Sequence, residues 1–135
     1  MSKVYVYTRN SNVEAFEKGS SRETQIKKCG SYASIKDLVV DEIVQEQCSG
    51  QLPFDRRDKA FELLKKLKTN DHIICSHLDR FCRNTLSLLQ MIQKFKKKKI
   101  YLHFVDLNCE VTGSDAIGNV FLTMLSCFSQ FTAEQ

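Results

Sequence analysis

The sequence lacks the segments that mark several classes of protein. It contains one proline and five glycines in 135 residues, and it shows no repeat, low-complexity tract or linker. It opens on a strand-like segment, without a signal peptide or an apolar run long enough for a membrane span. We therefore expect a single domain over residues 1–135, located in the cytoplasm and without membrane contact.

The sequence also lacks recognisable metal-binding and nucleotide-binding patterns. Its six cysteines form no CxxC pair, and Cys75 and Cys127 lie in apolar runs, where a free thiol behaves as a small hydrophobe. No HxxxH pair, no Walker glycine loop and no cluster of Asp and Glu typical of a two-metal nuclease is present. A disulfide framework, a zinc site and two-metal chemistry are therefore not predicted.

What is present is an ordinary globular composition with a mild positive charge. Hydrophobic residues make up 42% and charged residues 27%, and the net charge of +4 gives a pI near 8.7. This charge permits a nucleic-acid partner, but a mildly basic cytosolic domain has the same charge. Lys96–Lys99 ends a predicted helix, which indicates either a solvated helix end or a contact with the DNA backbone.

Strand-like and helix-like segments alternate along the chain. Strands are predicted at residues 3–8, 38–46, 72–76 and 100–105, and helices at 21–35, 56–68, after Asn84 as cap, and at 115–132. The helix at 56–68 is expected to bury Ala60, Phe61, Leu64 and Leu67. This alternation predicts an α/β sandwich with a mainly parallel sheet.

The last predicted helix carries a wide apolar stripe. Such a stripe either docks on the sheet of the same chain or forms a subunit interface. The residues that we assign to the second possibility are Val120, Phe121, Met124, Leu125 and Phe128.

Four arginines lie in or next to predicted strand-to-helix connections: Arg9, Arg57, Arg80 and Arg83. The carboxyl ends of parallel strands are where ligands bind in open α/β sheets. Arginine suits phosphate because its planar fork donates to two oxygens and stays charged. Ser11, beside Arg9, is then the natural nucleophile for a metal-free phosphoryl transfer.

The order of these motifs resembles that of the serine recombinases, which comprise resolvases, invertases and serine integrases. Tyr7-Thr8-Arg9-Asn10-Ser11 is similar to their Y-x-R-x-S opening, and Leu78-Asp79-Arg80-Phe81-Cys82-Arg83 is similar to their L-D-R-x-x-R signature. Gln25, Ser49-Gly50 and Arg57 match motifs between these two, and 118–130 resembles the start of the long dimerisation helix. The resemblance covers essentially the whole chain.

The resemblance implies a resolvase-like three-layer sandwich with a four- to five-stranded, mainly parallel sheet, in which 115–135 begins the dimerisation helix. Ser11 would attack a DNA phosphodiester to form a covalent 5′-phosphoserine, with strand exchange and religation that need neither ATP nor metal. Arg9, Arg57, Arg80 and Arg83 would surround the phosphate, and Asp79 would orient them. Gln25, Glu46 and Ser49 would support the site, with Glu46 standing where the family often has aspartate. The group that takes the serine proton stays open, and we interpret His77 as a structural residue at a strand end.

The implied partners are double-stranded DNA and further copies of the chain, as a homodimer in solution and a homotetramer with two DNA sites, with no cofactor and no small-molecule substrate. A bacterial, archaeal, phage or viral origin is expected. The resemblance implies that target recognition resides in a domain after the long helix, which we expect to lie outside residues 1–135. Two alternatives stay open: a catalytically silent recombinase-like protein that organises DNA, and a flavodoxin-like domain that binds a phosphorylated ligand. Resolvase, invertase, integrase and transposase roles are not separated.

Overall fold

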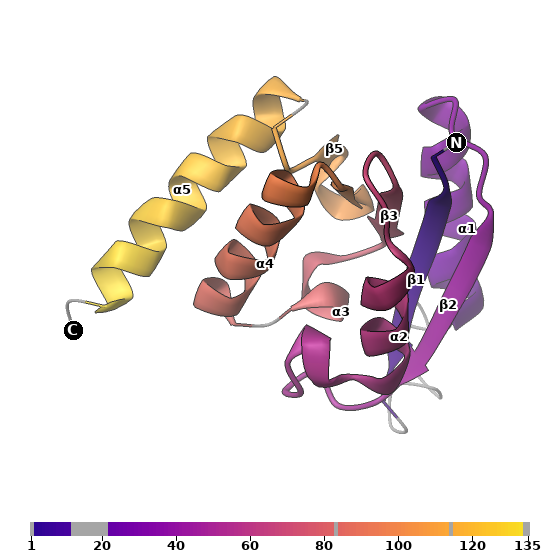
Figure 1. Cartoon of the computed structure of the whole chain (residues 1–135), viewed down its shortest axis with the longest axis horizontal. Helices are drawn as coiled ribbons and strands as arrows, with labels where there is room; N and C mark the ends of the chain where they lie inside the picture. Colours follow the sequence, from indigo (N-terminus) through magenta and orange to yellow (C-terminus); the bar gives the residue numbers. More distant parts are fainter. Residues whose placement is uncertain (1, 12–21, 83, 114, 134–135) are drawn as a thin grey trace.

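The computed structural model describes residues 2–11, 22–82, 84–113 and 115–133, which fold around one five-stranded sheet (Figure 1). The strand order is β2-β1-β3-β4-β5. The strands are β1 (Val4–Asn10), β2 (Glu42–Gln47), β3 (His72–Cys75), β4 (Tyr101–Phe104) and β5 (Cys109–Glu110). The first four are parallel to their neighbours and β5 is antiparallel to β4. The predicted α/β fold with a mainly parallel sheet is confirmed.

Helices cover both faces of the sheet and make a three-layer sandwich (Figure 1). One face carries α1 (Arg22–Ile35), and the other carries α2 (Asp58–Lys66), α3 (Leu78–Phe81) and α4 (Thr85–Lys98), with α5 (Ala116–Ala133) packed on α4 and β5. Short 3-10 turns, η2 (Phe54–Arg56) and η3 (Val105–Leu107), precede α2 and β5. No helix in these ranges combines the length and the apolar character needed to cross a lipid bilayer.

Strand β1 runs through the centre of both cores. All seven of its residues are buried, which is typical of a parallel strand covered on two faces. Alternate side chains point to opposite faces, so Val4 and Val6 pack with α1, whereas Tyr5 and Tyr7 pack with the larger core beneath α2 to α4. This alternation also sends the side chain at position 9 toward the larger core.

The predicted cap of α4 is confirmed. The Oδ1 atom of Asn84 accepts a hydrogen bond from the backbone N–H of Ser87 at 3.0 Å, and it thereby satisfies one of the free donors at the helix start. The helix ends at Lys98, and the next residue, Lys99, has a left-handed φ of 61°.

Two local predictions were wrong. Strand β2 begins at Glu42 rather than at residue 38, because the carboxylate of Asp41 accepts a hydrogen bond from the N–H of Val4 at 2.8 Å and so turns the chain into the sheet only there. On α2, Phe61 is 48% exposed and lies under the ammonium group of Lys65, whereas Leu63 takes the buried position. The side of the helix that faces the sheet carries Ala60 and Leu63. Of these two, only Ala60 belongs to the predicted apolar stripe.

Helix α5 approaches the sheet closely at its start. Gly118 is buried there, and a Cβ atom at this position would overlap the carbonyl group of Glu110. Further along, Leu125 is 7% exposed and belongs to the larger core, with Phe121 and Leu122 partly buried beside it. One side of α5 therefore docks on its own chain, as the first of the two interpretations predicts.

Candidate active site

The carboxyl ends of β1, β2 and β3 point to the same edge of the sheet, and those of β1 and β2 lie at the bottom of Figure 1. Ser11 directly follows β1, Cys48 and Ser49 follow β2, and α3 follows β3 after a short loop. The parallel register pairs Asn10 with Gln47, so the ends of the two strands lie side by side. The residues predicted from separate motifs are brought to one place because parallel strands share their carboxyl edge.

Arg9 is fully buried and donates hydrogen bonds to three main-chain carbonyls. Its Nε donates to the carbonyl of Arg80 at 3.2 Å, and its Nη1 donates to that of Cys48 at 3.1 Å. Its Nη2 lies 3.4 Å from the carbonyl of Asp79. The guanidinium thus ties the end of β2 to the α3 segment.

Arg57 is buried to the same extent and reaches the same segment from the other side. Its Nη1 donates to the carbonyl of Arg80 at 2.8 Å and to the hydroxyl of Tyr7 at 3.2 Å, while Nε donates to the carbonyl of Leu52 at 3.0 Å. Its Nη2 is buried and has no hydrogen-bond partner among the described residues. A single carbonyl, that of Arg80, accepts from both buried guanidinium groups.

Glu46 connects this network to α2. Its buried carboxylate accepts hydrogen bonds from the N–H groups of Lys59 at 3.1 Å and Ala60 at 2.9 Å, which are free donors in the first turn of the helix. It also accepts from the hydroxyl of Tyr7 at 3.3 Å. Burial raises the pKa of Tyr7, so that this hydroxyl keeps its proton and can donate to Glu46 while it accepts from Arg57.

Gln25, at the start of α1, fixes the end of β1. Its Oε1 accepts from the N–H of Arg9 at 3.1 Å, and its Nε2 donates to the carbonyl of Arg9 at 3.1 Å and to the Oδ1 of Asn10 at 3.0 Å. The side chain therefore extends the hydrogen bonding of the strand and sets the backbone that leads into Ser11. Its described contacts are with β1 itself.

The remaining predicted residues lie around this buried layer. Ser11 and Arg80 are half-buried, whereas Asp79 and Ser49 are exposed. Asp79 meets Arg9 through its backbone carbonyl rather than through its carboxylate. The Oγ of Ser49 accepts from the N–H of Gln51 at 3.1 Å and shapes the turn after β2. Arg83 lies outside the described residues.

His77, which we interpret as a structural residue at the strand end, has its Nδ1 3.1 Å from the hydroxyl of Ser76. Sequence reasoning had not assigned roles to Tyr7 and Cys48. The period of β1 could have found Tyr7, which shares a face with Arg9 two residues later. Burial raises the pKa of Cys48, although Arg57 and Arg9 oppose this, and the thiol beside the site stays protonated at neutral pH.

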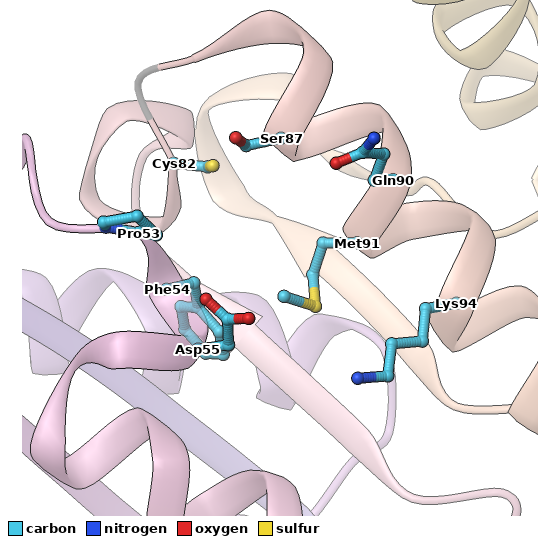
Figure 2. A pocket seen from close by; sticks show the side chains of 8 residues that line it. All are labelled: Pro53, Phe54, Asp55, Cys82, Ser87, Gln90, Met91 and Lys94. Atoms are coloured by element: carbon cyan, nitrogen blue, oxygen red, sulfur yellow. The ribbon is translucent and has the colours of Figure 1, made fainter.

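A hollow of about 170 Å³ lies next to the site, between η2 and α4. Figure 2 shows Phe54 and Asp55 on one side of it and Ser87, Gln90, Met91 and Lys94 of α4 on the other. Beside this hollow, the rings of Phe54 and Phe81, with centroids 4.2 Å apart, keep the segments that lead to Arg57 and away from Arg80 in contact. Among the described ranges, no three His, Cys, Asp or Glu side chains are grouped so that they could hold a metal ion.

Comparison with curated proteins finds relatives along most of the chain. Transposon Tn2501 resolvase from Escherichia coli is 24% identical over 131 residues, which are 97% of this chain and 63% of the relative. A resolvase from Clostridium perfringens (strain 13 / Type A) is 30% identical over 101 residues, which are 70% of this chain and 52% of the relative. The chain thus spans between 52% and 63% of the length of these two relatives.

Comparison with solved structures also finds recombinases. The crystal structure of the N-terminal catalytic domain of TP901-1 integrase superposes with a TM-score of 0.83 at 28% identity, and the match covers 98% of this chain and 97% of that one. A resolvase family site-specific recombinase from Streptococcus pneumoniae has a TM-score of 0.69 at 20% identity, with 99% and 89% covered, and supports the fold. A model of the family described as "Resolvase, N terminal domain" matches residues 4–135. The chain therefore belongs to the serine recombinase family and corresponds to its N-terminal catalytic domain.

Proposed function

We propose that this chain is the catalytic domain of a site-specific DNA recombinase with Ser11 as its nucleophile. One observation carries the proposal: Arg9, Arg57 and the Arg80 segment converge at the strand end that leads into Ser11. Such a gathering of fixed positive charge is what a phosphoryl group needs as negative charge grows on its oxygens. A cytoplasmic location is part of the proposal, since the substrate is DNA.

In the proposed step, the Oγ of Ser11 bonds to the phosphorus of a DNA phosphodiester while the bond from phosphorus to the 3′ oxygen breaks. The serine proton passes to a base that stays unassigned, and the leaving oxygen takes up a proton to become a 3′-hydroxyl. The 5′ end is then held as a phosphoserine ester. Attack of a 3′-hydroxyl from the exchanged strand reverses the step, so that the phosphodiester is regained without ATP.

The two buried arginines have a particular place in this proposal. Because Arg9 and Arg57 donate to main-chain carbonyls, they act on the reaction through position and charge: they hold the α3 segment and keep two positive charges beneath it. Arg80, which is half-buried, and Arg83 are the arginines that we assign to the phosphate itself. Nε, Nη1 and Nη2 of Arg9 each donate to a main-chain carbonyl, those of Arg80, Cys48 and Asp79, so we assign Arg9 to holding these segments.

Self-association through α5 belongs to the same proposal. Ile117, Val120, Met124 and Phe128 recur at spacings of three and four residues, and they are 54% to 65% exposed. An exposed apolar stripe at helical spacing suits burial against a second copy. Leu125 is excluded from this interface because it lies in the chain's own core, and Phe121 contributes only the part that stays accessible. We propose a dimer in solution and a tetramer on two DNA sites.

The chemistry is tested with a nicked suicide DNA substrate, which traps a covalent intermediate because the cleaved end is lost. The chain is expected to form an adduct that survives denaturation. Ser11→Ala should abolish the adduct, whereas Ser31→Ala, a matched change at an exposed position on α1, should leave it unchanged. An adduct that persists in Ser11→Ala overturns the assignment of the nucleophile. A chain that binds DNA but never forms an adduct on its own site is instead the silent, DNA-organising protein.

A further inference from the structure

A second basic region lies at the opposite edge of the sheet, where β1 and β3 begin (top of Figure 1). A hollow of about 370 Å³ opens there, and three lysines line it: Lys3, Lys66 and Lys68. Strand β1 has seven residues, and at about 3.3 Å per residue the two edges lie on the order of 20 Å apart. This hollow is therefore separate from the site at Ser11.

The acidic residues of the hollow are already engaged. The carboxylate of Asp71 accepts hydrogen bonds from the backbone N–H groups of Lys3 and Lys68, both at 2.9 Å. Glu42 lies 2.8 Å from the ammonium group of Lys66. Within the described part of the chain, the ammonium groups of Lys3 and Lys68 form no ion pair, so their charge is available to a ligand.

The positive charge continues onto the end of α4. The N–H of Asn70 donates to the carbonyl of Lys99 at 2.7 Å, which brings the last residue of the lysine run Lys96–Lys99 next to the loop that carries Lys68. All four lysines of the run are exposed, and none pairs with an acidic residue that the structure describes. The cations in the last turn of α4 interact favourably with the helix dipole, whereas Lys99 lies beyond that turn.

We propose that this amino-end surface, formed by Lys3, Lys68, Lys98 and Lys99, binds the phosphodiester backbone of a duplex DNA segment other than the one at Ser11. Exposed lysines act as point charges for phosphate and read no base sequence, so the binding depends on salt and not on the DNA site. A straight duplex across the carboxyl edge does not reach this surface on the other side of the sheet. The inference goes beyond the proposed cleavage: that this is a second DNA segment rests on the proposed binding of DNA at Ser11, whereas the binding of a duplex to these lysines does not.

The test is a titration of the chain with a fluorescent duplex of arbitrary sequence at several salt concentrations, read by anisotropy. The variant Lys68→Gln with Lys99→Gln is compared with Lys27→Gln with Lys28→Gln, which removes the same charge from exposed positions on α1. Each lost phosphate contact lowers the slope of log K against log salt by about 0.9. The slope of the edge variant is expected to shrink by about 2 and that of the α1 variant to stay unchanged.

Equal losses in both variants, or no loss in either, would overturn the proposal. ATP serves as the small phosphorylated probe: ATP binding that only the edge variant loses, with duplex binding intact, assigns the hollow to a free ligand and also overturns it. A loss of self-association by the Lys68→Gln, Lys99→Gln variant in the absence of DNA also overturns the proposal, since the surface is then a contact between copies of the chain. The variant Lys68→Gln with Lys99→Gln should still form the Ser11 adduct. If the unmodified chain forms no adduct but the two double variants still differ in salt slope, only the proposed function is contradicted.

Discussion

The two ends of the sheet both carry basic side chains, but they hold them in opposite ways. At the carboxyl end, Arg9 and Arg57 are fully buried and donate to main-chain carbonyls. At the amino end, Lys3, Lys68 and Lys99 are exposed and form no ion pair with a described acidic residue. A guanidinium remains charged when it is buried and can serve several acceptors at once, which an ammonium group does less well. One end of the sheet therefore fixes its charge in place, and the other leaves it open to partners and to salt.

Two histidines of the sheet, His103 buried and His72 half-buried, show a third outcome. The hydroxyl of Tyr32 lies 2.8 Å from the Nδ1 of His103, whose Nε2 lies 2.8 Å from the Nδ1 of His72. Burial lowers the pKa of both imidazoles, that of His103 to about 4. The histidines are thus neutral at pH 7, while the buried arginines keep their charge. Burial therefore leaves the weakly basic imidazole uncharged, whereas the strongly basic guanidinium keeps its charge and is held in place by its hydrogen bonds.

The largest expected effect is on the buried arginines. Arg57→Ala leaves the carbonyl groups of Leu52 and Arg80 and the hydroxyl of Tyr7 without their donor, and it should lower the free energy of unfolding by about 4 kcal/mol. Urea denaturation measures this loss. The matched change Lys68→Ala, at an exposed cation, should cost less than about 0.5 kcal/mol. Similar losses in the two variants would remove the distinction between buried and exposed charge.

Acid should destabilise the fold through His103. Its folded pKa of about 4 lies below the value of 6.5 of a free imidazole, so the unfolded chain binds the proton first as the pH falls. Stability is therefore full above pH 6.5 and decreases toward pH 4, by on the order of 3 kcal/mol from this group. Denaturation series at several pH values measure it. In His103→Gln, which keeps a polar side chain but does not titrate, the decrease over this window should be smaller; an unchanged decrease assigns it to other groups.

The next effect separates two glutamates near α2. Glu46 is buried and accepts hydrogen bonds from the first turn of the helix, whereas Glu62 is exposed and 3.9 Å from Lys65. Glu46→Gln should cost about 2 kcal/mol, because one acceptor becomes a donor and the negative charge near the helix start is lost. Glu62→Gln should cost less than about 0.5 kcal/mol. Thermal unfolding of both variants checks the ranking, and a reversed order contradicts the assignment of Glu46 to the network.

The smallest effect on stability is expected for the exposed stripe of α5. Met124→Lys replaces a side chain that is 54% exposed, so unfolding should change by less than about 0.5 kcal/mol. Sedimentation analysis should nevertheless show weaker self-association, because the new charge must be buried in a dimer. Thr123→Lys, at an exposed polar position next to it, is the control. Equal association of the two variants places the interface elsewhere.

The sequence predicted the order of the elements and the edge at which the motifs meet. Alternating periodicities located four of the five strands, and the cap at Asn84 was correct to the residue. Strand β5, with two residues, is too short for any period to be visible. Phe61 was assigned to the core because the helical stripe of α2 fits two neighbouring faces, and only the packed sheet chooses between them.

The sequence predicted that the candidate residues lie close together, but not how deeply they are buried. The structure brings the guanidinium groups of Arg9 and Arg57 to the main-chain carbonyl of Arg80. The sequence could not show that Arg9 and Arg57 are buried, because a charged side chain is exposed unless a partner compensates it. Here the partners are main-chain carbonyl groups, and one of them is 71 residues from Arg9. Because every residue has such a group, the sequence cannot show which ones accept from the arginines.

The proposed function depends most on the hydroxyl group of Ser11 as the group that bonds covalently to DNA. Mass spectrometry identifies the residue that carries the nucleotide, after the trapped adduct has been digested with trypsin and nuclease. A nucleotide 5′-phosphate is expected on Ser11, in the peptide that begins after Arg9. A nucleotide on Ser49, or on any residue other than Ser11, would contradict it.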